Sequence, residues 1–421
     1  MSRRAQSTTV RAATVAAMLV CAGCGGKTGL DVGDAAPRPD SGTPADAGRP
    51  PRCVEVPRAG GEVTVALTLP VSLAVADVFF LIDATGSMSD EIDNVRAGLR
   101  SVVVPGVRAA IPDPAFGLGF LGEFPERPYG PPDIKPYELR SPITRDVVRI
   151  EGGLDRVPSW GNADDPEAQV EALYQVATGD GLLPWIPATS GCAGGGSGGA
   201  CFREDALPVV VLITDAPMHD GPDGADPYRL TPPPHAWPET REALRSRGIL
   251  VIGLGATDAG ERSPLPQLEA VSRETGAVDA RGEPLVFDIG ASGDRVGAGI
   301  VDAIERLAAG VPLDVDAVVV DMPGDGVDAL TVVRAIRPRS ADPPGGVRAI
   351  EADRFVGVTP GTRVVFELVL DAAGLPPSAA TRRFAARVLF RADGRSRLGS
   401  EDVVIVVPGT DSGGCEGMEG A

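Results

Sequence analysis

The sequence contains very few lysines, histidines and asparagines, with two of each among 421 residues. The histidines, His219 and His235, do not stand beside a nucleophile motif, and no G-x-S-x-G, H-E-x-x-H or phosphate-binding loop motif is present. A metal ion held by hydroxyl groups can support hydrolysis, but the sequence offers no evident general base for such a reaction. We therefore expect that the protein is not an enzyme.

Basic residues are outnumbered by acidic ones, and the formal net charge is −19. Lys27 and Lys135 are the lysines, so nearly all of the cations are arginines. This balance argues against a nucleic-acid partner, because nucleic-acid recognition needs a basic face. The length of the chain allows about two domains, each with a buried core.

Long apolar runs are lacking, and the N-terminal run AATVAAMLV (12–20), preceded by Arg3, Arg4 and Arg11, is too short for a membrane span. The pattern is typical of an export signal. The following CAGCGG resembles the end of a bacterial lipobox, which implies that residues 1–23 are a signal peptide and that Cys24 is lipidated. Cys21 departs from that motif, which usually has leucine there. An ordinary secretory signal and twin-arginine export are the alternatives. We expect an envelope lipoprotein of the outer membrane or cell surface, held by its lipid alone.

Residues 24–52 contain almost no large apolar side chains, so we expect them to form a disordered tether. Four cysteines follow, an even number that suits disulfides in an oxidising compartment. Cys192 and Cys201 flank a glycine-rich loop and are expected to pair locally, which leaves Cys53 to pair with Cys415. A zinc site is the alternative, although structural zinc sites usually begin with more closely spaced cysteines.

Strand and helix patterns alternate between residues 77 and 310. The continuous apolar run 78–82 predicts a strand that is buried on both faces. A helix with apolar residues at helical spacing follows it and is expected to stop near Pro105. Further strands are expected at 115–124, 208–214, 249–254 and 285–289, and further helices at 166–179, 239–248, around Leu268 and at 291–309. This alternation predicts an α/β fold with a doubly wound, mostly parallel sheet.

Residues 311–410 have a different pattern, with short β-type segments separated by proline and glycine turns. Such a pattern predicts a β-sandwich domain. Residues 53–76 also have a strand pattern, and a Cys53–Cys415 bond would make them part of the same sandwich. The α/β domain would then be inserted in the sandwich, and residues 411–421 would form a tail that carries Cys415.

Oxygen-bearing side chains gather where two of the expected strands end. Asp83 follows the strand 78–82, with Thr85 and Ser87 two and four residues later, and Asp215 follows the strand 208–214. Ligands of parallel α/β sheets gather at the carboxyl ends of the strands. Two carboxylates there need a proton, a donor or a cation. Carboxylate and hydroxyl oxygens suit Mg²⁺ or Ca²⁺, so we expect Mg²⁺ at this central site.

The stretch DATGS (83–87) resembles the D-x-[ST]-x-S motif of von Willebrand factor A domains. TDA (214–216) resembles the aspartate that completes the metal-ion-dependent adhesion site of that family. The resemblance covers roughly residues 77–309, and it implies a Rossmann-like α/β fold and a metal-dependent binding function.

Within that family the sequence is most similar to the A-like domain of integrin β subunits. Asp90 and Glu91 stand where those domains carry the carboxylates of an adjacent metal site, where Ca²⁺ is an option. NADDPE (162–167) resembles the stretch that holds a third ion in that family. The resemblance implies that the third site is formed by Asn162, Asp164 and the carbonyl group of Pro166, and that Glu167 also reaches the central ion.

The sequence departs from the integrin pattern in several places. Glu91 stands where integrins have aspartate, and Thr85 stands where they have serine. The cysteine-containing specificity loop is absent, and Asp133 is a candidate to replace an aspartate of that loop at the third site.

Parts of the pattern also have simpler interpretations. Asp164 and Asp165 precede a helix and can cap it, and this is the interpretation that we prefer for Asp165. Asp90 and Glu91 can be solvated charges of a first helical turn. We interpret His219 as a hydrogen-bonding residue of a loop and not as a metal ligand.

The resemblance implies a protein that binds a partner. A hydroxyl-rich set of ligands leaves the cation electrophilic with an open position, which an Asp or Glu carboxylate of a protein ligand can fill. We therefore expect an adhesion or ligand-binding protein. The alternative is a structural subunit of a surface assembly, in which the metal only stabilises the fold. In the family, ligand binding can also move the last helix, here 291–309, which leads directly into residues 311–410.

Overall fold

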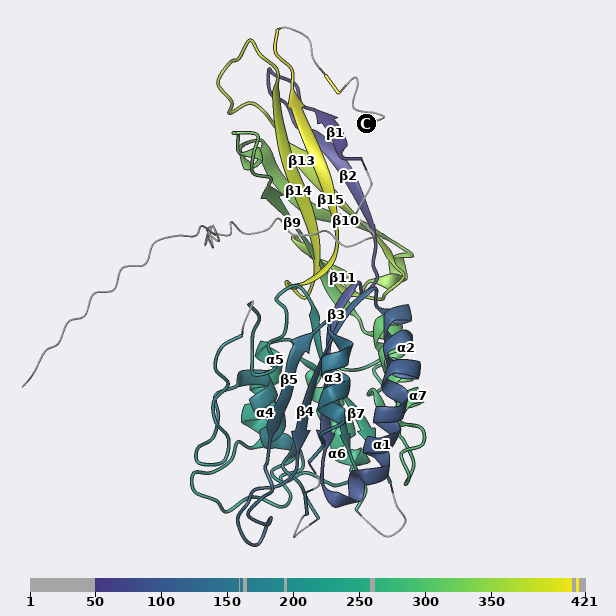
Figure 1. The fold of residues 1–421 in the computed structure, drawn as a ribbon. Helices are drawn as coiled ribbons and strands as arrows, with labels where there is room; N and C mark the ends of the chain where they lie inside the picture. The colour runs from purple at the N-terminus through teal and green to yellow at the C-terminus, as the bar shows by residue number, and fades with distance from the viewer. Residues whose placement is uncertain are drawn as a thin grey trace, which may run out of the picture. The chain divides into compact units, whose positions relative to one another are not determined.

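The computed structural model describes residues 50–158, 160–161, 165–192, 195–257, 262–410 and 414–415. They form a mixed α/β structure with several sheets (Figure 1). The helices are α1 (Ser89–Gly98), α2 (Val104–Ala110), α3 (Val147–Leu154), α4 (Gln169–Thr178), α5 (Trp237–Ser246), α6 (Leu265–Thr275) and α7 (Val296–Gly310). The strands are β1 (Arg52–Glu55), β2 (Val63–Pro70), β3 (Val75–Asp83), β4 (Asp113–Leu121), β5 (Glu138–Thr144), β6 (Leu207–Thr214), β7 (Leu250–Gly255), β8 (Val286–Asp288), β9 (Leu313–Asp321), β10 (Val333–Asp342), β11 (Ala349–Ile350), β12 (Arg354–Val358), β13 (Arg363–Leu370), β14 (Arg382–Ala392) and β15 (Ser396–Val407).

One sheet contains β3–β8, in the order β5-β4-β3-β6-β7-β8. Neighbouring strands from β4 to β8 run parallel, and β5 is antiparallel to β4. The chain first adds strands on one side of β3 and then returns to add β6, β7 and β8 on the other side. Ligands of α/β sheets bind where the strand order reverses in this way, here between β3 and β6.

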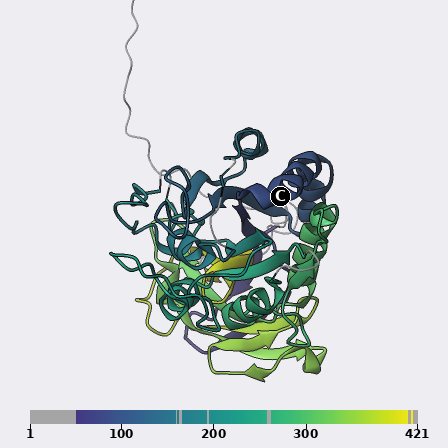
Figure 2. The ribbon, with the colours of Figure 1, turned by 90° about the horizontal axis from the view of Figure 1, so that it is seen from below.

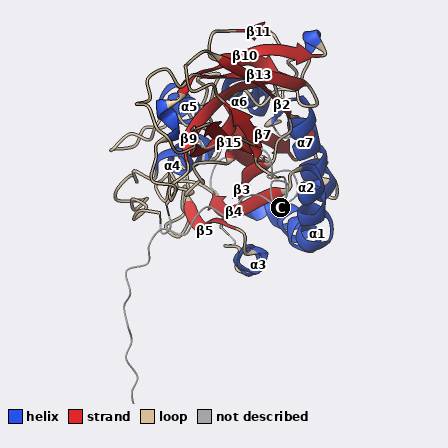
Figure 3. Ribbon diagram, turned by 90° about the horizontal axis from the view of Figure 1, so that it is seen from above, coloured by secondary structure: helices blue, strands red, loops and turns tan. Residues whose placement is uncertain are grey.

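Alternate side chains of β3 belong to two separate apolar clusters. Val78, Phe80 and Ile82 pack in the cluster that contains residues of α1, α2 and α7, whereas Phe79 and Leu81 pack with residues of α4, α5 and α6. Figure 3 shows α1, α2 and α7 on one side of the strands and α4 and α5 on the other. This burial on both sides explains why residues 78–82 form a continuous apolar run.

The helix after β3 does not stop at Pro105, contrary to the prediction from the sequence. Residues Leu99–Val103 form a π-helical turn, after which α2 continues to Ala110 with Pro105 in its first turn. The first turn of an α-helix is the position at which proline is best tolerated. The π-helical turn therefore allows the helical path to continue through the proline.

The β region is formed by β1, β2 and β9–β15. β1 pairs with β15 in a six-stranded sheet that also contains β9, β11, β12 and β14, and β2 pairs with β13 in a three-stranded sheet with β10. Phe366 of the smaller sheet contacts Phe355 and Phe390 of the larger one, with ring centroids 5.1 and 5.7 Å apart. Residues from both ends of the described chain thus share these sheets. The elements β3–α7, which lie between β2 and β9 in the sequence, form the α/β region.

Both predicted disulfides are present, Cys53–Cys415 and Cys192–Cys201. The first joins residues separated by 362 positions, which links the start of β1 to the chain beyond β15. Among the described residues, no helix has the length and apolar character needed to cross a membrane. The predicted signal peptide, Cys24 and nearly all of the predicted tether lie outside the described residues.

Candidate metal site

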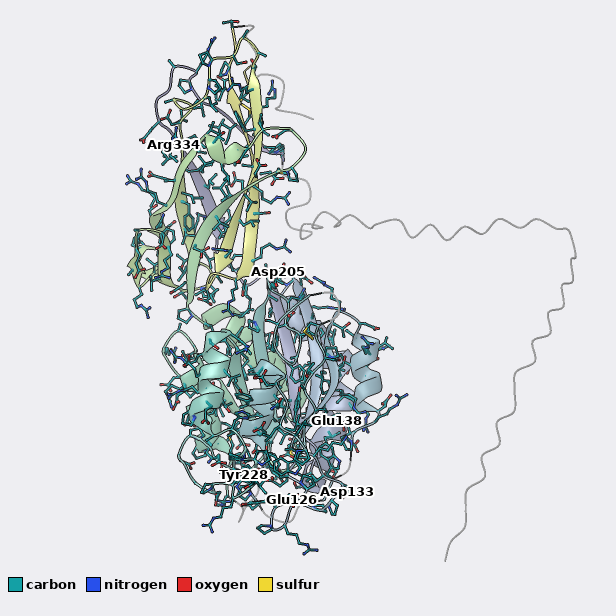
Figure 4. All side chains as sticks on the ribbon, turned by 90° about the vertical axis from the view of Figure 1, so that its left-hand side faces the viewer. Glu126, Asp133, Glu138, Asp205, Tyr228 and Arg334 are labelled. Atoms are coloured by element: carbon teal, nitrogen blue, oxygen red, sulfur yellow. A yellow bond between two sulfur atoms is a disulfide. The ribbon has the colours of Figure 1, made fainter. Side chains whose placement is uncertain are left out.

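The candidate site lies at the carboxyl ends of β3 and β6. The two strands pair in parallel up to Ile82 and Ile213, so Asp83 and Asp215 follow on neighbouring strands. Loops extend from this end of the α/β region, which Figure 2 views from below. Figure 4 shows Glu126, Asp133 and Tyr228 at this end, and Asp205 at the opposite end of the same region. The structure therefore brings together the two aspartates that lie 132 positions apart in the sequence.

Hydroxyl groups hold the Asp83 carboxylate from two sides. Thr85 donates to Oδ1 through its backbone amide at 3.0 Å and through its hydroxyl at 2.7 Å. Thr214, the last residue of β6, donates its hydroxyl to Oδ2 at 2.8 Å. All three residues are buried, so the carboxylate has a fixed position at the end of the strand.

Ser87 and Asp215 form the more open side of the site. The Ser87 hydroxyl is exposed, lies 3.3 Å from the Thr85 hydroxyl and hydrogen-bonds the Asp215 carboxylate. Asp215 is half-buried. Two carboxylates and two hydroxyls thus come together, and Ser87 and Asp215 are the less buried residues of the four.

The carboxylates of the site are destabilised as anions. Burial, followed by the charge of Asp215, raises the pKa of Asp83 to about 7. Burial also raises the pKa of Asp215, and it raises that of Glu91 to about 7 with smaller contributions from Asp215 and Asp90. Among the described residues, no arginine, lysine or histidine forms an ion pair with Asp83, Glu91 or Asp215. A cation would relieve this repulsion, which is the physical test of fit for a metal ion.

Glu91 lies in the first turn of α1 and does not point into solvent as a surface charge would. Its side chain is buried, and its Oε2 atom has no hydrogen bond among the described residues. Gly293, in the turn before α7, lies so close that a Cβ atom there would be 2.6 Å from Glu91 Cγ. Asp90, by contrast, is exposed.

Glu167 is buried and its backbone is tied to the loop after β6. Its amide donates to the Pro217 carbonyl at 3.0 Å, and its carbonyl accepts from His219 at 3.0 Å. The sequence had suggested a helix that begins at Pro166. The pairing of Glu167 with this loop explains why α4 begins instead at Gln169. Glu167 therefore lies beside the loop that begins with Asp215.

The predicted third site is only partly described. Pro166 is buried next to Glu167, whereas Asn162 and Asp164 lie outside the described residues. Asp133 is exposed in the loop between β4 and β5. His219 is buried and donates from Nδ1 to the Asp226 carbonyl at 2.5 Å, which is the loop role expected for it.

No cluster of three or more His, Cys, Asp or Glu side chains in the described part of the chain has the arrangement of a metal site. The central site differs from such a cluster because two of its oxygen donors are hydroxyls. Mixed sets of this kind suit Mg²⁺, which is usually held by one or two carboxylates together with other oxygens.

Two functional candidates, Gln169 and Thr214, were missed by the sequence analysis. Thr214 lies directly before Asp215, and its place at the end of a predicted strand could have indicated a role beside Asp83. Gln169 gave no such signal, because a polar residue in an amphipathic helix is expected to face solvent. The structure instead buries it against the end of β6.

Comparisons with solved structures identify matches with low sequence identity and low TM-scores. The protein called von Willebrand factor type A from Catenulispora acidiphila matches with 11% identity and a TM-score of 0.37, over 85% of this chain and 72% of that one. Proximal thread matrix protein 1 from the mussel byssus matches with 14% identity and a TM-score of 0.33, over 59% and 48%. The pilus adhesin SpaC from Lactobacillus rhamnosus GG, in its open conformation, matches with 12% identity and a TM-score of 0.34, over 83% and 45%.

The matched regions thus span less than half of the mussel and Lactobacillus chains. No protein-family model and no curated protein sequence matches this chain.

Proposed function

We propose that the protein is a metal-dependent binding protein whose α/β region is a doubly wound domain of von Willebrand factor A type. Mg²⁺ at the central site would be held by Asp83, Thr85, Ser87, Asp215 and Glu167. The ion supplies a positive charge with an open position that attracts a carboxylate of a protein partner. The proposal includes no catalytic step.

The observation that carries the proposal is the pairing of a buried acid, Asp83, with a half-buried one, Asp215, at two neighbouring strand ends where the described residues supply no cation. Asp83 is completely buried beside Asp215, and both have raised pKa values. The chain places an arginine beside the other buried aspartate of β3, Asp77, which Arg203 contacts at 2.6 Å, whereas the donors to Asp83 are neutral. The exposed Ser87 hydroxyl leaves one side of the site open to solvent and to a partner.

The integrin-like details of the sequence extend this proposal. The buried Glu91 Oε2 atom, together with Asp90, supplies oxygens for an adjacent Ca²⁺ site. Asn162, Asp164 and the Pro166 carbonyl are proposed for a third site. Lipidation of Cys24 and a tether over 24–52 would display the module at the outer membrane or cell surface.

Ligand binding is also proposed to act on α7. The turn before α7 packs on Glu91 through Gly293, and Asn94 of α1 donates to the Ser292 carbonyl at 2.9 Å. α7 ends at Gly310, three residues before β9 begins. Distances between spin labels in the α/β and β regions would test this idea, and identical distances in Mg²⁺ and in EDTA would refute it.

The central site is tested by calorimetric titration of the protein with Mg²⁺ and by the electron paramagnetic resonance of bound Mn²⁺. We expect Mg²⁺ binding that is abolished by Asp83→Asn and weakened by Ser87→Ala. The matched control is Asp316→Asn, because Asp316 of the β region is paired with Arg391 and lies outside the site. A protein that binds neither ion, or an Asp83→Asn variant that binds as well as the unsubstituted protein, would refute the proposal.

The open position is tested with a carboxylate probe. We expect the blocked peptide Gly-Asp-Gly, but not Gly-Asn-Gly, to change the Mn²⁺ spectrum of the loaded protein. The alternative function is a structural subunit in which the metal only stabilises the fold. That alternative predicts a large rise in melting temperature with Mg²⁺ and no difference between the two peptides.

A further inference from the structure

The first residue of α4, Gln169, makes an unusual set of contacts for a helical glutamine. Its side chain is completely buried, and Nε2 donates to the Thr214 hydroxyl and to the Ala216 carbonyl, each at 3.0 Å. Its Oε1 atom is buried without a hydrogen bond among the described residues. Burial of an unsatisfied acceptor is unfavourable, so this amide is retained at a cost to folding.

The orientation of this amide is fixed by its surroundings. Ala216 O can only accept, so the group that faces it must be the NH₂ and not the oxygen. The same NH₂ then donates to Thr214 Oγ1. The Ala216 amide also lies 3.2 Å from that hydroxyl, where it can only donate. Because both of these groups occupy the lone pairs of the hydroxyl, its single proton is left to donate, and Asp83 Oδ2 at 2.8 Å is a closer acceptor than the Ala216 carbonyl at 3.4 Å.

We propose that Gln169 is a positioning residue that acts through Thr214 to hold Asp83 in the orientation needed to bind a cation. This inference rests on the proposed metal site and assigns it a supporting residue. With Gln169 in place, Thr214 donates to Oδ2 while Thr85 donates to Oδ1. Oδ2 of Asp83 thus keeps a lone pair for a cation, whereas Oδ1 accepts both the amide and the hydroxyl of Thr85, and the hydrogen bonds to both oxygens oppose rotation of the carboxylate.

The hydrogen bonds from Gln169 through Thr214 to Asp83 also link the site to the segment that carries Glu167. Gln169 is two residues after Glu167, and it bonds the end of β6 from which Asp215 follows. One amide therefore connects the helix start, the strand end and the carboxylate. Support of this kind behind a metal ligand typically contributes about 10- to 100-fold to metal affinity.

The test compares Gln169→Met with Gln175→Met. Methionine keeps the length and flexibility of glutamine but removes the hydrogen bonds. Gln175 is the matched control because it is a buried amide of the same helix, and it bonds Glu171 Oε1 at 2.7 Å and the Gly181 amide at 2.8 Å, away from the site. Mg²⁺ affinity is measured by calorimetry on the full-length protein, and the melting temperature is measured in EDTA.

We expect Gln169→Met to weaken Mg²⁺ binding about 10- to 100-fold, and Gln175→Met to lower the melting temperature without changing Mg²⁺ affinity. Thr214→Val should weaken Mg²⁺ binding by a similar factor, and the double variant should lose no more than the stronger single variant, because both residues act through one hydrogen bond. Circular dichroism in EDTA checks that each variant is folded.

Unchanged Mg²⁺ affinity in Gln169→Met, an equal loss in Gln175→Met, or multiplicative losses in the double variant would each overturn this inference while leaving the metal site intact. Absence of Mg²⁺ binding by the unsubstituted protein would overturn the proposed metal site and this inference together.

Discussion

The two ends of strand β3 each bury an aspartate, and the chain compensates them in opposite ways. Asp77 and Asp83 are both fully buried, six residues apart on one strand. Asp77 accepts hydrogen bonds from the Arg203 amide and Nε, both at 2.6 Å, whereas Asp83 accepts from two threonine hydroxyls. Burial raises the pKa of Asp77 to about 6, although Arg203 acts in the opposite direction and lowers it. Burial together with the charge of Asp215 raises the pKa of Asp83 to about 7.

A buried carboxylate is stable as an anion only when a cation or sufficient donors replace the lost water. At the start of β3 the fold supplies an arginine for this purpose. At its end the fold supplies neutral hydroxyls and a second acid, so either a proton or the cation that we propose would neutralise this pair. The contrast separates an acid that is paired with an arginine from an acid that is held by neutral donors beside a second acid.

A third buried acid lies between these extremes. Glu171 of α4 is buried and accepts from Gln175 Nε2 at 2.7 Å and from the His235 amide at 2.8 Å. His235 also places Nδ1 3.0 Å from Glu171 Oε2. The cation that compensates Glu171 is therefore one that titrates near neutral pH.

The largest effect is expected from Arg203→Met, which leaves Asp77 buried without its cation. Loss of one partner from a buried pair costs roughly 3 kcal/mol or more of unfolding free energy. The loss should be smaller at pH 5 than at pH 8. Without Arg203, the pKa of Asp77 in the folded variant lies even further above its value in the unfolded chain, so protonation of Asp77 at low pH stabilises the folded variant. Urea unfolding at both pH values measures this. Asp77→Asn combined with Arg203→Met should recover most of the loss, and a loss that is independent of pH would contradict the interpretation.

The same substitution should have opposite effects at the two ends of β3. In EDTA at pH 8, Asp83→Asn is expected to raise the unfolding free energy by about 1 kcal/mol, because it removes a buried charge that Asp215 repels. Asp77→Asn is expected to lower it, because Arg203 loses its nearest carboxylate at 2.6 Å and keeps only the longer contact with Asp113 at 3.1 Å. Denaturant unfolding of the two variants checks the signs, and equal signs would mean that the two aspartates do not differ as described.

The smallest effect is expected at His235. Glu171 raises the pKa of His235 against the opposing effect of burial, so its stabilising contribution is complete below about pH 6.5 and is lost as the pH rises through the folded-state value. The contribution should be about 0.5 kcal/mol, since the imidazole is partly solvated. Unfolding free energies from pH 5.5 to 8.5 should fall more steeply for the unsubstituted protein than for His235→Gln. Parallel curves would exclude a charged His235 as the partner of Glu171.

The sequence was informative where chemistry follows from strand order. The run 78–82, the strand 208–214 and the aspartates after them were sufficient to predict that Asp83 and Asp215 belong to one edge of a sheet. The cysteine pairings also followed from spacing and number. These features depend on local patterns and on general rules of α/β topology.

Other features were not predictable because they join distant residues without a local pattern. Asp77 stands in an apolar run, and nothing near it indicates Arg203, 126 positions away. Gln169 has the appearance of a surface residue of α4 until β6 is placed against it. The helix that passes Pro105 needed a π-helical turn, for which the residues 99–103 carry no known signal.

The position of β3 has a mechanical consequence. A pulling force between the N-terminal end of β1 and a partner held at Asp83 would run through β2 into β3 and along its whole length. β3 is paired in parallel on both sides, with β4 and with β6, so this force would shear two rows of hydrogen bonds at once instead of opening them one by one. The Cys53–Cys415 bond would share the load with β15 before it reached β3. The strand that ends in Asp83 of the proposed site is thus paired along both of its edges against such a force.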